Sequence, residues 1–220
     1  DAFDSDENED RTMQLEARSD FDLDESDSAS EVFATDEDDV DAGALGYSIE
    51  ILHDLDRFTQ PEVPITWTRF EPQHRVAVES APLTEPLVIA GFGHVDLWLQ
   101  PGTADTAVQA TLLEVRPDGY EQRVQSGWHR PVHQVEDPDH SDDLRVDYTF
   151  APEDRSPLVP GDWIRFRLPI YPFAHVFRPG SRLRLQISTP GRDHPFWCFD
   201  NPVEAGASHT VGLRGAHASS

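Results

Sequence analysis

Alternation of apolar and polar residues is the sequence feature that most constrains the fold of this chain. Over residues 95–100 every second position is apolar, with Val95, Leu97 and Leu99 on one side of an extended backbone. The same period of two recurs in three further segments, namely 145–150, 163–168 and 182–187. One apolar face with this period is typical of antiparallel strands that are half covered by a second layer. No segment after residue 81 shows a sustained helical period, so this region is expected to be all-β.

Turn signals separate the alternating segments. Pro-Gly or Asp-Gly pairs stand at 101–102, 118–119, 160–161 and 179–180. Asp-Gly between two extended runs favours a tight hairpin. We expect eight or nine strands over the roughly 135 residues from 81 onward. That number and length predict a two-sheet antiparallel jelly-roll sandwich of the galactose-binding-like kind over residues 81–220.

The first 45 residues have a different composition. Residues 1–41 hold 18 acidic residues against two arginines, a net charge of −16 out of −25 for the whole chain. Such a segment repels itself and buries too little apolar surface to offset the entropy of ordering. We therefore expect an acidic, disordered or loosely packed segment over 1–45. Residues 46–80, with prolines at 61, 64 and 72, are expected to form an extended lead-in with short strands at 65–67 and 74–79.

Composition excludes several classes of protein. No apolar run approaches the roughly 18 residues needed to cross a membrane, and the net charge of −25 disfavours binding to nucleic acid. No signal peptide is recognisable, which favours a cytoplasmic location. All 17 basic residues are arginine, and together with the acidic surplus this predicts a halophilic protein whose carboxylates keep it soluble in strong salt.

Catalytic and metal-binding patterns are missing from the sequence. The G-x-S-x-G turn that presents a serine nucleophile does not occur. Cys198 is the single cysteine and lies between Trp197 and Phe199, where an apolar setting makes a thiol unreactive. His129 follows an expected strand and is interpreted as an edge or turn residue, and the acidic loop 136–143 as a solvated surface loop. We assign no catalytic residue, no metal site and no cofactor.

A basic surface is the one candidate site that the pattern offers. If the strands at 163–168 and 182–187 alternate as expected, five side chains point outward: Trp163, Arg165, Arg167, Arg182 and Arg184. If these strands are neighbours, the five form a face that docks on a partner domain, because tryptophan and arginine are enriched at interfaces. The alternative is that these arginines pair with surface carboxylates.

Five sequence motifs resemble those of a known family. They are APLTEPLVIAG at 81–91, VDLWLQ at 95–100, DTAVQATLLEVRPDG at 105–119, FAHVFRPGSRLRLQIS at 173–188 and TPGRDHPFWCFDN at 189–201. In this order and spacing the stretch 81–216 resembles the C-terminal β-domain of serine hydrolases of the X-Pro dipeptidyl-peptidase and cocaine-esterase type. The acidic residues 1–45 have no counterpart in this resemblance.

The resemblance implies a non-catalytic role for this chain. In that family a separate α/β-hydrolase domain carries the catalytic triad, and none of its motifs matches a residue here. The implied partner is an α/β-hydrolase catalytic domain or subunit that acts on acyl esters or peptides, with an oligomer as a further option. Two alternatives stay open: a free-standing module that binds carbohydrate or another ligand, and a structural assembly subunit.

Overall fold

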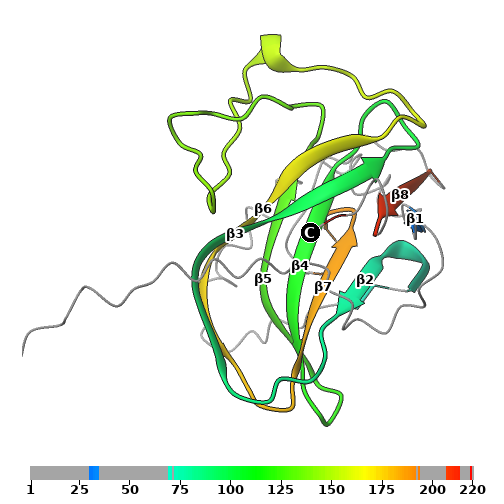
Figure 1. Ribbon diagram of the computed structural model, residues 1–220. Helices are drawn as coiled ribbons and strands as arrows, with labels where there is room; N and C mark the ends of the chain where they lie inside the picture. Colours follow the sequence, from blue (N-terminus) through cyan, green and yellow to red (C-terminus); the bar gives the residue numbers. More distant parts are fainter. Residues whose placement is uncertain are drawn as a thin grey trace, which may run out of the picture.

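The computed structural model contains two four-stranded antiparallel sheets (Figure 1). It describes the backbone of 30–34 and residues 69–70, 72–191, 193, 207–213 and 219. The strand orders are β1-β8-β3-β6 and β2-β7-β4-β5. The strands are β1 (Ser30–Ala34), β2 (Val76–Glu79), β3 (Leu87–Gln100), β4 (Val108–Val115), β5 (Glu121–His129), β6 (Ile164–Phe177), β7 (Arg182–Ser188) and β8 (Ser208–Gly212). The described residues also contain two short 3-10 helices, η2 (Pro72–His74) and η3 (Pro152–Asp154).

The hydrophobic core lies between the two sheets. Apolar side chains of β3 and β6 meet those of β2, β4 and β7 in one cluster. Leu97, Leu99 and Leu168 are fully buried there. The predicted alternation in 95–100, 163–168 and 182–187 is therefore confirmed, because the apolar member of each pair faces the opposite sheet.

The predicted hairpin at Asp118-Gly119 joins β4 to β5. Gly119 has φ +83°, a conformation that side chains other than glycine rarely adopt. The Arg116 amide donates a hydrogen bond to the Tyr120 carbonyl at 2.9 Å, which closes the turn. In β5, Gly127 allows β6 to approach closely, since a Cβ atom there would lie 1.9 Å from the Pro169 carbonyl oxygen.

The predicted strand at 145–150 is wrong. This segment belongs to a long irregular loop between β5 and β6 that has isolated bridges, Glu136 with Tyr148 among them. Its amides bond locally: the Asp142 carboxylate accepts hydrogen bonds from the amides of Leu144 at 2.8 Å and Arg145 at 2.7 Å. Alternation alone thus did not identify a strand, because these backbone groups find partners within the loop.

The number of strands after residue 81 is also smaller than expected. Six strands, β3 to β8, lie in the described residues beyond that position, against the eight or nine predicted. The long strands β3 and β6 have 14 residues each and take up more of the chain than typical strands do.

Two strands come from the region before residue 81. β2 confirms the predicted extended segment around Val76 and Val78, and it pairs with β7. β1 lies within the acidic segment 1–45 and pairs with β8 from Ser30 to Ala34. Only these five residues of that segment are described, and they form a strand where no ordered element was predicted. The free edge of β8 supplies backbone partners that a sequence pattern does not reveal. The predicted strand at 65–67 lies outside the described residues.

No helix in the part of the chain that the structure describes is long and apolar enough to cross a membrane.

Candidate functional site

The residues predicted to form one docking face lie in two different sheets. Arg165 and Arg167 belong to β6, which is an edge strand, and Trp163 directly precedes it. Arg182 and Arg184 belong to β7, which lies inside the other sheet between β2 and β4. Since the apolar sides of both strands face the shared core, the two arginine pairs are on opposite outer faces. β6 and β7 are therefore not neighbours, and the five residues do not form a single basic face.

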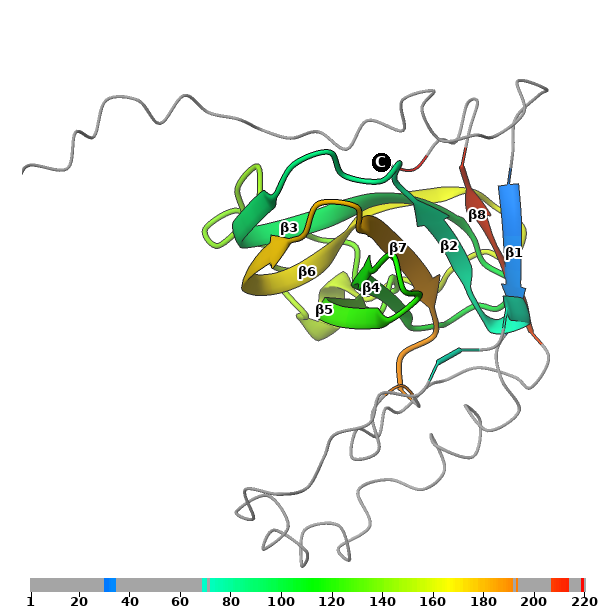
Figure 2. The same ribbon diagram turned by 90° about the horizontal axis from the view of Figure 1, so that it is seen from below.

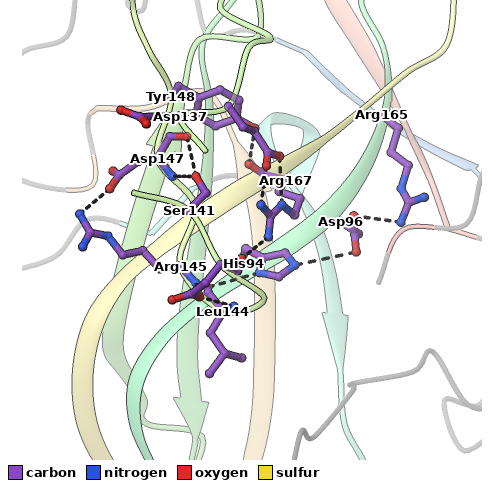
Figure 3. A network of polar contacts seen from close by, with 12 residues as sticks. His94, Asp96, Asp137, Ser141, Leu144, Arg145, Asp147, Tyr148, Arg165 and Arg167 are labelled. Atoms are coloured by element: carbon purple, nitrogen blue, oxygen red, sulfur yellow. Dashed lines mark hydrogen bonds and ion pairs between the residues drawn. The ribbon is translucent and has the colours of Figure 1, made fainter. Parts of the chain in front are cut away.

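Arg167 fastens the long loop to the edge of its sheet (Figure 3). Its guanidinium donates to both carboxylate oxygens of Glu136, with Nε 3.0 Å from Oε1, and its Nη1 lies 2.7 Å from the Asp142 carbonyl oxygen. The Tyr148 hydroxyl donates to the Arg167 carbonyl at 2.7 Å. The hydrogen bond from Arg167 holds the pKa of Glu136 below its ordinary value. This arginine is therefore engaged within the chain, as the carboxylate-pairing alternative predicts.

The other three arginines also have partners. Arg165 lies 3.0 Å from Asp96, which also faces His94 at 3.9 Å (Figure 3). Arg184 lies 2.5 Å from Glu79 and 2.7 Å from Glu121. Arg182 donates to the Ser80 carbonyl at 3.2 Å.

A partly buried carboxylate anchors the start of the loop. Asp105 accepts hydrogen bonds from Arg130 at 2.8 and 2.6 Å and from Arg155 at 2.8 Å. Burial alone would raise the pKa of Asp105, but the two guanidinium groups outweigh it and hold the pKa below its ordinary value. Loop residues 130 and 155 are thus tied to the turn between β3 and β4.

His129 is the last residue of β5, which is an edge strand, so the predicted edge position is confirmed, but its side chain lies in the interior. Its side chain is 3% exposed, and its ring stacks on Tyr148 with 3.8 Å between centroids. Burial lowers the pKa of His129 to about 4, so the ring is neutral near pH 7. The signal that sequence reasoning lacked is the position of Tyr148, which lies 19 residues away and packs on this ring only in the folded loop.

Glu114 was also missed by the sequence analysis. Its carboxylate is fully buried on the inner side of β4, where it accepts hydrogen bonds from the Arg178 amide at 2.8 Å and pairs with His175 at 3.2 Å. Burial alone would raise the pKa of Glu114, yet these bonds outweigh it and lower the pKa. The carboxylate joins β4 to the end of β6 and to the turn that follows. Its chemistry is that of a structural anchor, because both oxygens already have partners.

One small cavity lies on the outer face of the β2-β7-β4-β5 sheet. It has a volume of about 70 Å³ and is lined by polar side chains that include Arg75, Glu121 and Gln186. Pockets that hold drug-sized ligands are several times larger, about 300–1,000 Å³. The cavity is too small for an ester or peptide substrate. Within the described ranges, no three His, Cys, Asp or Glu side chains gather as a metal site. Cys198 lies outside those ranges.

The outer surface of the β3–β6 pair has two dissimilar halves. Toward the ends of the strands at Gln100 and Ile164 it carries the polar network of His94, Asp96 and Arg167. Beyond a register shift between Gly91 and Gly93 it carries exposed apolar side chains instead, such as Val88 and Val176.

Known proteins that are similar to this chain in sequence or in fold include several hydrolases. A protein from Mycobacterium bovis, named as a candidate serine esterase, is 32% identical over 117 residues, which are 52% of this chain and 19% of that protein. A CocE/NonD family hydrolase from Staphylococcus aureus shares the fold with a TM-score of 0.55 at 15% identity, covering 74% of this chain and 36% of its own. An alpha-amino acid ester hydrolase has a TM-score of 0.58 at 18% identity, covering 90% of this chain and 32% of its own.

The chain therefore spans about a third of the solved relatives and a fifth of the curated one. The family match itself extends over residues 1–217. It includes the acidic segment, for which the sequence analysis found no counterpart, and so corrects the resemblance drawn from 81–216 alone. With two antiparallel sheets and a family match over nearly its whole length, this chain belongs to the X-Pro dipeptidyl-peptidase C-terminal non-catalytic domain family.

Proposed function

We propose that this chain is the β-domain of a serine hydrolase that cleaves acyl esters or peptides, and that the catalytic residues lie in an α/β-hydrolase domain outside it. The family match over 1–217 carries the proposal, since the family is non-catalytic by description. The shares of the relatives support it, because this chain corresponds to only 32–36% of the solved hydrolases. By analogy with that architecture the domain covers and shapes the catalytic domain.

Two buried titratable side chains, His129 and Glu114, are held in the interior by contacts within the chain. His129 is buried and neutral, and Glu114 is saturated with hydrogen bonds. A serine hydrolase needs a nucleophile, a base and an orienting group within hydrogen-bond reach of one another. The contacts of His129 and Glu114 support a structural role for both.

An activity assay tests the proposal directly. The isolated chain is incubated with an activated ester and with a serine-reactive fluorophosphonate probe, and the complete gene product is treated in parallel. We expect turnover and labelling only in the complete protein, at a serine outside these 220 residues. Turnover by the isolated chain that disappears when one of its own serines is replaced by alanine would contradict the proposal.

Two finer features are part of the same proposal. The two antiparallel sheets are compatible with the jelly-roll, galactose-binding-like arrangement, which we retain as the proposed fold type. We also propose adaptation to high salt, supported by the net charge of −25 and the use of arginine as the sole basic side chain. Salt at 1 M shortens the reach of charge repulsion to ~3 Å, so the melting temperature should rise between low and molar KCl. A flat or falling melting temperature would argue against it.

A further inference from the structure

An exposed apolar strip covers one half of the outer surface of the β3–β6 pair. Its members are Val88, Ala90, Phe92, Tyr171, Ala174 and Val176. Four of them are large and well exposed: Val88 at 68%, Val176 at 53%, Phe92 at 45% and Tyr171 at 40%. The two alanines are exposed as well.

The strand register makes these side chains one continuous surface. Val88 lies directly opposite Val176, and Ala90 lies directly opposite Ala174. Side chains that face each other across an antiparallel pair are about 4.5–5.5 Å apart at Cβ, so each of these two pairs forms a contact across the strands. Phe92 and Tyr171 follow at the register shift that ends this half of the pair. The small alanines at the centre leave the strip flat, which suits contact with another protein surface.

The opposite side of the same strand segments packs on the core with partly buried apolar side chains. Leu87, Ile89 and Phe173 pack against the cluster of Leu112, Phe177 and Leu183. These segments are therefore apolar on both sides. Strands with this pattern are typical of sheets that are covered on both faces, whereas strands with one solvated face alternate apolar with polar residues. The pattern indicates that a second layer covers the strip in the working protein.

The absence of charge in the strip bears on which molecule forms that covering layer. None of its six members is charged, although the chain carries a net charge of −25. At its border the Arg145 guanidinium lies over the Phe92 ring, 5.5 Å from the centroid. Two copies of so acidic a chain repel each other, which disfavours a second copy as the covering layer.

The length of the solved relatives points to another domain of the same hydrolase as the covering layer. About two thirds of each solved hydrolase lies outside the part that this chain matches. The strands β8 and β1 do not cover the strip, since they lie at the other end of β3, where β8 pairs with Leu99 and Gln100 (Figure 2).

We propose that the apolar strip is the surface through which this domain docks on its catalytic hydrolase domain. The proposal rests on the proposed function and places the contact on β3 and β6, away from Arg182 and Arg184 on β7. The facing surface of the catalytic domain is then apolar and uncharged. An exposed apolar patch of this kind marks an interaction site in a soluble protein.

The test uses the complete hydrolase that contains or binds this chain. The strip variant carries Val88→Asp with Val176→Asp, and the matched control carries Val135→Asp with Val159→Asp. The control valines are also exposed, at 44% and 58%, but they lie outside the strip. A milder variant, Val88→Thr with Val176→Thr, keeps β-branched side chains in case the aspartates disturb the strands. Limited proteolysis measures how fast this domain is released from the rest.

We expect the aspartate strip variant to be released about 30-fold faster than wild type, as for interface residues of large effect, and the threonine variant to fall between the two. The control should match wild type. Equal release rates for the strip variants and wild type would overturn this docking proposal. If a serine outside this chain is still labelled in that case, the proposed function stands. A strip variant that changes only from dimer to monomer in light scattering would also overturn it, with a second copy as the occupant. If no serine outside this chain is labelled, both proposals fail.

Discussion

The two halves of the outer β3–β6 surface are built by the same two strands and yet meet different surroundings. In one half Asp96 lies opposite Arg167, and the loop after β5 wraps over the sheet edge and bonds to it. In the other half Val88 lies opposite Val176 and both are exposed. Because the strands continue from one half into the other, strand formation does not depend on which outer side chains they carry.

This difference shows that the inner and outer side chains of a strand have separate roles. The inner side chains of both halves pack into the core, with Leu97 in the polar half and Phe177 in the apolar half both fully buried. The outer side chains decide what covers the sheet. Ion pairs hold a loop of the same chain on the polar half, whereas the apolar half is left for another surface.

The largest effect on the free energy of unfolding is expected from replacing a side chain on the inner side of β6. Phe177→Ala should lower the free energy of unfolding by about 3–5 kcal/mol, because it removes a fully buried ring and leaves a cavity. Urea denaturation of the chain measures this. A loss below about 1 kcal/mol would show that the apolar half is not rigidly packed on its inner side.

The next largest effect is expected from acid, through two buried histidines of β5 and β8 that lie outside the outer β3–β6 surface. Burial lowers the pKa of His129 from 6.5 to about 4 in the folded chain, and that of His209 likewise to about 4. Each ring therefore binds a proton more readily when unfolded, so stability is full above pH 6.5 and is lost as the pH falls toward 4. One such shift is worth about 3 kcal/mol when complete.

Urea denaturation at pH 7.5 and pH 4.5 checks this sign. His129→Phe should reduce the difference between the two pH values, since one titrating ring is gone, and the effect of His209 should persist. Equal unfolding free energies for wild type at both pH values would contradict the buried, neutral state of these rings.

Arg167→Ala should have a moderate effect. It removes the paired hydrogen bonds to Glu136 and the bond to the Asp142 carbonyl, and we expect a loss of about 1–2 kcal/mol because the groups remain partly exposed. Hydrogen exchange should rise in the loop between β5 and β6 and stay unchanged in the apolar half. Arg165→Ala serves as the control. It breaks a single pair with Asp96 at 3.0 Å on a side chain that is 55% exposed, so it should cost less.

The smallest effect on the free energy of unfolding is expected at Val176, the sequence neighbour of Phe177. Val176→Thr should change the unfolding free energy by no more than ~0.5 kcal/mol, because the side chain is 53% exposed and the strand keeps a β-branched residue. The contrast with Phe177→Ala, one residue away, measures how sharply the two sides of β6 differ. A loss as large as that of Phe177→Ala would mean that this half is already covered within the chain.

Several features of the fold could be predicted because they depend on neighbours in sequence. Alternation identified β3, β6 and β7, and Asp118-Gly119 identified the β4–β5 turn. These signals are local: successive side chains of a strand point to opposite faces, and a tight turn needs a positive φ at a fixed position. The family resemblance rested on the same strands and was confirmed, over a longer range than expected.

The sequence by itself thus determined that the chain makes antiparallel strands with one side in a shared core. Only the tertiary structure decided which strands became neighbours, and so placed Arg167 and Arg184 in different sheets instead of on one basic face. It also brought Tyr148 onto His129 and buried Glu114 against Arg178. The physical reason is that a period of two specifies which side of a strand is apolar. Strand order and loop packing depend on contacts between residues far apart in the chain, and those contacts leave no periodic trace in the sequence.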